Sequence, residues 1–293
     1  MLLMYGLGTE PWVLVQTLKP HLKKKSPAEY CRAFAGQNCR VVASDIPQRM
    51  DDMLDLSSDQ IEKIELDVSS DERVPSAVNT VISKYGHIGV LLNNAGIGST
   101  GPLAEFSLDA IKKAWEINTL GELRMVQQVV PHMASWRRGS IANVGIVVGR
   151  VLTPWAGSYC SSKAAPHAMT NTLRVELGPF GINAVLVVPG AVRSNFGSSN
   201  LERLRNHDWK IYKEFKDAIA ERARSSQGSQ ATDAKLFARN VVKKVLSPKP
   251  SKQIVFGPMI GDYDNFLFVV LSWSPLWVKD MFFSTRFNLN KRV

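Results

Sequence analysis

Short apolar and β-branched runs alternate with amphipathic stretches along most of the chain. The runs predict buried strands at 39–45, 62–68, 88–92, 141–144 and 184–188. The stretches between them carry apolar residues at helical spacing and predict helices over 28–36, 69–85, 107–130 and 159–178. Residues 12–17 are a candidate for an additional first strand. Alternation of strand and helix at this spacing predicts an α/β fold with a doubly wound parallel sheet, covered on both faces.

The pattern predicts a single domain with an appendage. Residues 1–196 would form the core of the sheet. Residues 197–264 are polar and rich in Ser and Arg at first, and would form a substrate flap and the last strand of the same domain. Residues 265–293 would form a helical, apolar C-terminal tail. No internal repeat is present.

The tail permits two interpretations. The run FLFVVLSWSPLWV at 266–278 contains Pro275 and is shorter than the ~20 residues of a membrane-spanning helix. It is either a buried segment or subunit contact, or an interfacial anchor with Trp273 and Trp277 at the level of the lipid headgroups. The first residues, Met1–Gly8, lack the basic leader and long apolar run of a signal peptide.

Composition narrows the class of protein. The chain has 36 Lys+Arg, 26 Asp+Glu and 45% hydrophobic residues, which excludes a disordered or fibrous protein. The net charge of +10 suits an anionic partner or an ordinary basic protein. Because the basic residues are mostly dispersed and no nucleic-acid-binding motif occurs, nucleic acid is not expected as a partner. Three cysteines, Cys31, Cys39 and Cys160, are too scattered for a metal site and suit a reducing compartment.

Candidate chemistry should follow the strands, because open parallel sheets bind ligands beyond the carboxyl ends of their strands. Polar or turn-forming residues stand at these places: Asp45, Asp67, Asn93–Gly96, Asn143–Ile146 and Pro189–Ser194. Tyr159 and Lys163 lie four residues apart on a predicted helix and so share one face. A lysine cation favours the tyrosine phenolate, which predicts a proton-transfer pair.

Four motifs occur in order: Asn93-Asn94-Ala95-Gly96, Asn118, Tyr159-x-x-x-Lys163 and Pro189-Gly190 with Ser194. Together they resemble the short-chain dehydrogenase/reductase family, which has a Rossmann-like fold, over roughly 28–195. The resemblance implies that Tyr159 is the catalytic acid, that Lys163 also holds the nicotinamide ribose, and that Asn118 holds a water. Asn118 could alternatively serve a helix kink or satisfy buried backbone groups. The implied cofactor contacts are Asp45, Asp67, Asn94, Ala95, Gly96, Tyr159, Lys163, Pro189, Gly190 and Ser194.

A narrower likeness concerns stretches such as LRMVQQVVPHMA, TPWAGSYCSSKAA and LRVELGPFGINAVLVVPGAVRSN. These resemble plant and fungal 1-acyldihydroxyacetone-phosphate reductases. That likeness implies NADPH, a lipid-like ketone substrate, and a place on the cytosolic face of the endoplasmic reticulum or on lipid droplets, with the cytoplasm as the alternative. It also implies a homodimer formed through the long helices, unless the tail covers that surface.

Two positions depart from the family pattern in ways that bear on activity. The family serine stands 13 residues before the tyrosine, where this chain has Ile146. Isoleucine cannot donate a hydrogen bond to a developing oxyanion. The phosphate loop is expected near 19–27, which contains no glycine, and Gly6 and Gly8 lie too far from Asp45 to replace it. These departures leave a non-catalytic binding or membrane-associated scaffold as an alternative, and an altered 5′ end of the transcript as a hypothesis for the loop.

Asp45 leaves the choice of cofactor open. A carboxylate at the end of the second strand accepts the ribose hydroxyls of NADH and repels the 2′-phosphate of NADPH. The narrower resemblance instead implies NADPH. A third alternative is that Asp45 only caps the helix that follows.

Overall fold

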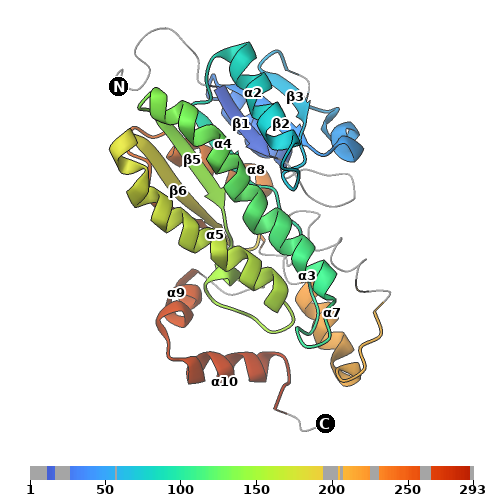
Figure 1. Cartoon of the computed structure of the whole chain (residues 1–293). Helices are drawn as coiled ribbons and strands as arrows, with labels where there is room; N and C mark the ends of the chain where they lie inside the picture. The colour runs from blue at the N-terminus through green and yellow to red at the C-terminus, as the bar shows by residue number, and fades with distance from the viewer. Residues whose placement is uncertain are drawn as a thin grey trace.

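The computed structural model describes residues 12–16, 27–56, 58–193, 204, 207–224, 231–257 and 265–290. In this part of the chain seven parallel strands form one sheet in the order β3-β2-β1-β4-β5-β6-β7. The strands are β1 (Trp12–Gln16), β2 (Arg40–Asp45), β3 (Ile61–Glu65), β4 (Val90–Asn93), β5 (Gly139–Val144), β6 (Ile182–Pro189) and β7 (Gln253–Phe256). The predicted doubly wound parallel sheet is therefore confirmed (Figure 1). The order reverses between β1 and β4, and ligands of such sheets bind at that reversal.

Helices cover both faces of the sheet. On one face α1 (Pro27–Ala35) packs against α8 (Ala234–Val245), and their apolar side chains share a core with β1, β2 and β6. On the other face lie α2 (Arg73–Tyr85), α4 (Gly121–Ser135) and α5 (Gly157–Glu176). In β1, Val13, Leu14 and Val15 are all fully buried, as expected of a strand that is covered on both faces.

The predicted helix over 107–130 is in fact interrupted. It consists of α3 (Leu108–Trp115), a π-helical turn over Glu116–Leu120, and α4. Gly121 lies so close to Val68 that a Cβ atom would come within 2.7 Å of the valine methyl. The side chain of Asn118 is also drawn into contacts outside its helix. This local widening is typical of functional positions in helices.

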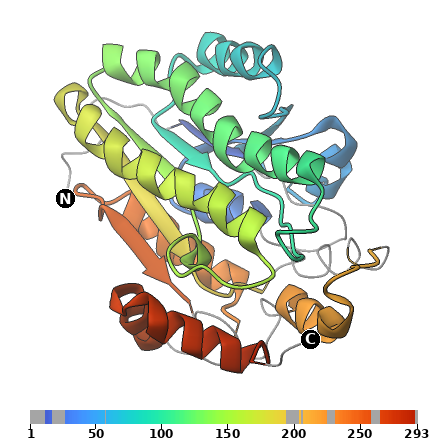
Figure 2. The same ribbon diagram turned by 60° about the horizontal axis from the view of Figure 1, so that its bottom comes forward.

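The flap and the tail lie together beneath the carboxyl end of the sheet. The described flap contains a short 3-10 turn (Lys213–Phe215) and α7 (Lys216–Arg224), and the tail contains α9 (Asn265–Trp273) and α10 (Leu276–Arg286). Figure 2 shows α9 and α10 below α5, with α7 beside them. The last strand, expected within 197–264, is β7 at the sheet edge.

The tail has a buried and an exposed side. Leu271, Phe283 and Phe287 are buried in the same apolar cluster as Tyr159. Trp273 and Trp277 are instead 87% and 66% exposed. No helix in the described ranges is long and apolar enough to cross a membrane. The inner side therefore matches the expected buried segment, while the interfacial anchor stays a prediction.

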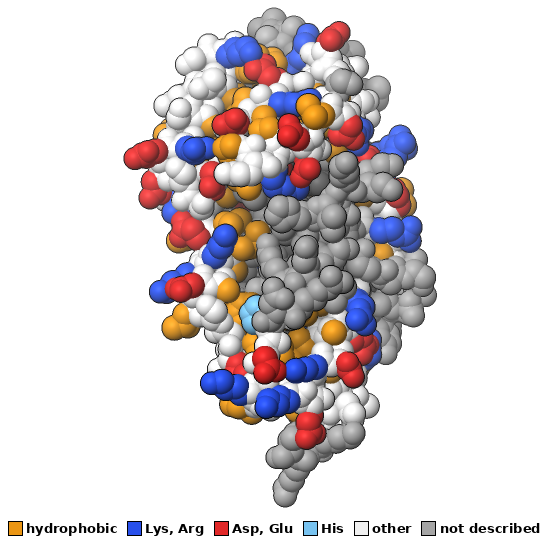
Figure 3. Space-filling model, turned by 90° about the vertical axis from the view of Figure 1, so that its right-hand side faces the viewer, with side chains coloured by type: hydrophobic (Ala, Val, Ile, Leu, Met, Phe, Trp, Pro, Cys, Tyr) orange, Lys and Arg blue, Asp and Glu red, His pale blue; other side chains and the backbone are white. Residues whose placement is uncertain are grey.

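Charged side chains of both signs are mixed over the described surface in Figure 3. Among the described residues the charges also pair, as Lys84 does with Glu62 at 2.6 Å. The coloured part of Figure 3 shows no large field of a single sign.

Candidate active site

Tyr159 and Lys163 lie on the first turns of α5, with only 7% and 5% of their surface exposed. The ammonium group of Lys163 donates a hydrogen bond of 2.8 Å to the carbonyl oxygen of Val144, where β5 ends. A Cβ atom on Gly96 would lie 3.5 Å from the same ammonium nitrogen. The structure thus brings the strand-end residue Gly96 and the helix residue Lys163 into contact, as the sequence predicts for a site at this edge.

A chain of amide side chains fixes the strand ends around that contact. Gln16 donates to Asn93 at 2.6 Å, Asn93 donates to Asn143 at 2.9 Å, and Asn143 donates to Thr170 of α5 at 3.0 Å. Asn94 donates to the main-chain oxygen of Gln16. All of these groups are buried, and buried amides are stable only when paired. We call Gln16, Asn93, Asn143 and Thr170 the amide ladder. It ties β1, β4, β5 and α5 together.

Asn118 occupies the π-helical turn and is 1% exposed. Its side-chain oxygen accepts from the N–H of Ile97 at 2.7 Å, and its nitrogen donates to the carbonyl of Ile97 and to the hydroxyl of Ser162, both at 2.9 Å. Ser162 in turn donates to the carbonyl of Tyr159. The side chain thus satisfies buried backbone and supports α5, in line with the structural alternative. A water held at Asn118 stays a prediction.

The charge of Lys163 depends on a residue that the motifs did not indicate. Burial lowers the pKa of Lys163, and the nearby Glu122 carboxylate acts against that fall. Burial likewise raises the pKa of Glu122, which is 6% exposed and has one oxygen without a hydrogen-bond partner. Each group therefore favours the charged form of the other, against the effect of burial.

The surroundings of Tyr159 are apolar. Tyr159 belongs to a cluster with Val147, Val151 and Trp155, and Ile146 packs against that cluster. Burial raises the pKa of the Tyr159 phenol, and the guanidinium of Arg222 acts in the opposite direction. Ile146 gives the site no hydroxyl, so charge on the phenol or on a bound carbonyl depends on cations.

These features place the chain among known proteins. The model of the family described as short chain dehydrogenase matches residues 28–204. The chain belongs to this family. It is 31% identical over 236 residues to the short-chain dehydrogenase ptmH of Penicillium ochrochloron. The matched stretch makes up 80% of this chain and 83% of the relative.

Solved structures agree on the fold. A short-chain dehydrogenase from Streptomyces avermitilis has a TM-score of 0.77 at 21% identity and covers 98% of this chain and 100% of its own. An alcohol dehydrogenase from Thermococcus sibiricus, complexed with 5-hydroxy-NADP, has a TM-score of 0.67 at 20% identity and covers 87% and 98%. The family and these relatives are dehydrogenases, so the chain is an oxidoreductase of the short-chain dehydrogenase type.

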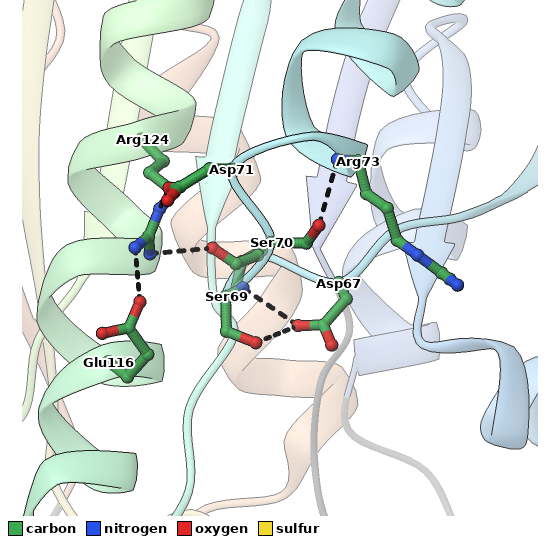
Figure 4. Close-up of polar contacts among 8 residues, drawn as sticks. Asp67, Ser69, Ser70, Asp71, Arg73, Glu116 and Arg124 are labelled. Carbon is green, nitrogen blue, oxygen red and sulfur yellow. Dashed lines mark hydrogen bonds and ion pairs between the residues drawn. The ribbon is translucent and has the colours of Figure 1, made fainter.

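The two strand-end aspartates of this short-chain dehydrogenase are engaged locally. Asp45 is 3% exposed and accepts from the N–H of Ile46 at 2.8 Å. Asp67 accepts from the N–H and hydroxyl of Ser69 at 2.9 and 2.6 Å, which closes the turn after β3 (Figure 4). The strand β3 therefore ends at Glu65, before residue 68, where the sequence pattern placed its end. Contacts of either carboxylate with a nucleotide stay predictions.

The turn after β3 is joined to α4. Arg124 pairs with Asp71 and Glu116 and donates to the carbonyl of Val68 at 3.3 Å. Figure 4 shows the guanidinium between the two acids, with the Asp67 turn beside it. This contact holds the expected adenine side of the site against the helix layer.

The far end of the sheet supplies the remaining predicted residues. Pro189 closes β6, and the N–H of Gly190 donates to the carbonyl of Phe256 in β7 at 2.9 Å. Ala95 and Gly96 are buried beside Asn94 at the end of β4. Ser194 and all but the last residue of the loop expected at 19–27 lie outside the described residues, as do Gly6 and Gly8.

Sequence reasoning missed three ionisable residues: Glu122 and His167, which are buried, and Arg222, which is partly buried. His167 stands four residues after Lys163 on α5 and accepts from the N–H of Ile146 at 3.2 Å. Its spacing from Lys163 was the available signal. A Cβ atom on Gly145 would lie 2.2 Å from the same imidazole nitrogen, so the Gly145 position admits His167 only because it is glycine. Arg222 comes from the flap, far along the chain, and no local pattern indicates it.

Proposed function

We propose that this chain reduces a ketone to a secondary alcohol with a nicotinamide dinucleotide. The observation that carries the proposal is the juxtaposition of Tyr159, Lys163 and the end of β4, with the Lys163 ammonium beside Gly96. The described residues fit the nicotinamide end of such a cofactor, because Lys163 is a buried donor beyond the carboxyl ends of β4 and β5, where ligands of parallel sheets bind. When bound, the cofactor supplies hydride.

The chain's own residues supply the proton. Tyr159 donates its phenolic proton to the carbonyl oxygen, and the charge of Lys163 favours the phenolate that is left. Asn118 holds α5 in place through Ser162, whose hydroxyl donates to the Tyr159 carbonyl. Pro189 and Gly190 would line the nicotinamide side, as family resemblance implies.

The nicotinamide cofactor is NADPH or NADH. The Thermococcus alcohol dehydrogenase carries an NADP derivative, which favours NADPH. Asp45 favours NADH, since its carboxylate would repel a 2′-phosphate.

Titration of each cofactor into the purified chain by calorimetry tests the proposal. Micromolar binding of either is expected, and Asp45→Ala should improve binding of NADPH if that carboxylate decides the preference. No binding of either at millimolar concentration to a folded chain would contradict the proposal and favour the scaffold.

For the substrate we propose a lipid-like ketone such as 1-acyldihydroxyacetone phosphate. Its support is the narrower sequence resemblance and the apolar cluster around Tyr159, which continues into the tail helices. Turnover of the acylated substrate should exceed that of dihydroxyacetone phosphate itself, followed through oxidation of the reduced cofactor. Equal turnover of both would argue against a lipid substrate.

We further propose that the outer side of the tail rests on a membrane surface, at the endoplasmic reticulum or a lipid droplet. Trp273, Leu276, Trp277 and Met281 are all at least 60% exposed on this side. Flotation with anionic vesicles should recover the chain, and Trp273→Ser with Trp277→Ser should abolish recovery. A matched change at exposed Leu236 on α8 serves as control. Recovery that is the same for all variants would count against the anchor.

A further inference from the structure

A cation of the flap is held against the loop that precedes Tyr159. Arg222 lies on α7, and its Nε donates a hydrogen bond of 2.9 Å to the hydroxyl of Thr153. Thr153 is 4% exposed and belongs to the loop that leads into α5. The bond therefore anchors Arg222 to Thr153, which stands six residues before Tyr159 in the chain and just before α5 begins.

Packing on two sides holds α7 in this place. Ile219 is buried in the apolar cluster that contains Tyr159 and Trp155, and Ala223 is buried as well. The rings of Tyr212 and Phe215, just before α7, lie 5.4 and 5.6 Å from the Trp155 ring. Arg222 lies between Ile219 and Ala223 on α7. The packing of these two buried residues therefore fixes the position of the helix turn that carries Arg222.

The tail adds a second tie to α7. Glu221, the residue next to Arg222, forms an ion pair of 2.7 Å with Arg286 of α10. Figure 2 shows α10 extending from below α5 towards α7. The Arg222 position thus rests on a hydrogen bond, apolar packing and a neighbouring ion pair.

Arg222 and Tyr159 influence each other electrostatically. The Arg222 charge lowers the pKa of Tyr159 against the effect of burial, and Tyr159 and Cys160 act back on the guanidinium. The side chain of Ile146 packs against the same cluster and has no group that can donate a hydrogen bond. A guanidinium remains charged at any working pH and has five N–H donors, more than the bond to Thr153 uses.

We propose that Arg222 is a catalytic residue that donates a hydrogen bond to the carbonyl oxygen of the substrate beside Tyr159, in place of the hydroxyl that Ile146 lacks. The inference rests on the proposed reductase function. Hydride from the reduced nicotinamide forms the new C–H bond, and the carbonyl π pair moves onto oxygen. That oxygen takes the proton of Tyr159, the resulting phenolate is later reprotonated from solvent, and Arg222 stabilises the negative charge without transferring a proton.

The test compares Arg222→Met with Arg222→Lys and with Arg224→Met, an exposed arginine on the same helix. Ketone reduction and alcohol oxidation are measured from about pH 6 to about pH 10, a range that approaches the tyrosine pKa. Arg222→Met should lower kcat by about 10²-fold, as does loss of one oxyanion donor. Its alcohol oxidation should also rise only at higher pH than in the wild type, because the phenolate has lost a cation. Arg222→Lys should keep the wild-type pH profile, and Arg224→Met should change neither quantity.

A rescue variant tests the proposed exchange of roles. Adding Ile146→Ser to Arg222→Met should restore kcat by about tenfold or more, since a hydroxyl donor returns to the oxyanion. Should Arg222→Met not fold, Arg222→Gln takes its place, because it keeps a donor and loses the charge. Calorimetric binding of the cofactor should be the same in all variants.

Three results would overturn the inference. One is an Arg222→Met variant with unchanged kcat and pH profile. Another is a rise in KM alone, which would assign Arg222 to a distant part of the substrate. The third is an unchanged kcat on adding Ile146→Ser to the folded Arg222→Met variant. If the wild type itself binds cofactor and reduces no ketone, the proposed function fails, and the inference about Arg222 fails with it.

Discussion

Tyr159 and Lys163 share one face of helix α5, but their surroundings differ, and we call these surroundings the side of Tyr159 and the side of Lys163. The side of Lys163 is polar and rich in hydrogen bonds: the amide ladder, the three hydrogen bonds of Asn118 and the bond from Lys163 to Val144 fix α5 against the sheet. The side of Tyr159 is apolar, with Trp155 and the tail helices packed around it. On one side position is fixed by hydrogen bonds, and on the other by close packing.

This difference assigns separate tasks to the two sides. Buried hydrogen bonds are directional, so the polar side sets the orientation of α5 against the sheet. An apolar environment strengthens the effect of each charge, so the few cations near Tyr159 act strongly on the reacting oxygen. Substitutions on the polar side should therefore affect stability first, and those on the apolar side should affect rate.

The largest effect is expected for Tyr159→Phe. The change removes the proton donor and leaves the ring in its cluster, so turnover should fall by about 10³-fold or more with nearly unchanged stability. Turnover and thermal unfolding are measured on the same preparation. Tyr85→Phe is the control. The Tyr85 hydroxyl is buried without a hydrogen-bond partner, and its ring stacks on Trp12, away from the site. Retained turnover in Tyr159→Phe would rule out Tyr159 as the acid.

The next largest effect concerns the polar side. Asn143→Leu interrupts the amide ladder and leaves Asn93 and Thr170 without this partner, which should reduce the free energy of unfolding by about 2–4 kcal/mol. Chemical denaturation measures the loss. Asn183→Leu, at the exposed position of β6, should change stability by less than about 0.5 kcal/mol. Similar losses in both variants would mean that the ladder does not stabilise the fold.

Acid should weaken the junction between the two sides through His167. Burial, with Arg150 and Lys163 nearby, lowers the pKa of His167 from 6.5 to about 4 in the folded state. Between these two pKa values His167 is protonated in the unfolded chain and neutral in the folded chain. The free energy of unfolding therefore falls as the pH drops from about 6.5 towards about 4. The contribution lost between pH 7 and pH 5 should be about 2 kcal/mol. It should be absent in His167→Gln and present in the control His132→Gln, as judged by unfolding at each pH.

The smallest effect is expected for Ile146→Ser in the otherwise natural chain. A hydroxyl beside Tyr159 adds one donor for the oxyanion, and because we propose that Arg222 already serves it, turnover should rise by only about threefold, less than in Arg222→Met. Loss of the apolar contact should reduce stability by about 1 kcal/mol. Ile146→Val, which keeps the apolar character, is the control. A decrease in turnover with Ile146→Ser would show that the apolar wall itself is required.

The sequence predicted the sheet because its strands are buried on both faces and stand out as apolar runs. The Tyr159/Lys163 pair and the Asn93–Gly96 turn were also predictable, since each rests on local spacing. The π-helical turn at Asn118 was not, because it depends on the approach of Gly121 to Val68. Glu122 and Arg222 could not be predicted either. Glu122 acts electrostatically on Lys163, and Arg222 on Tyr159, only because the folded chain brings these groups together.

The ion pair between Glu221 and Arg286 has a consequence for how the protein comes to be active. The α10 helix follows every other described element in the chain, so it leaves the ribosome last among them. Until it emerges, α7 lacks one of its ties and the cluster around Tyr159 lacks Phe283 and Phe287. A nascent chain can thus complete its sheet while the wall of its active site is still unfinished. Onset of activity during synthesis should coincide with release of the tail rather than with formation of the sheet.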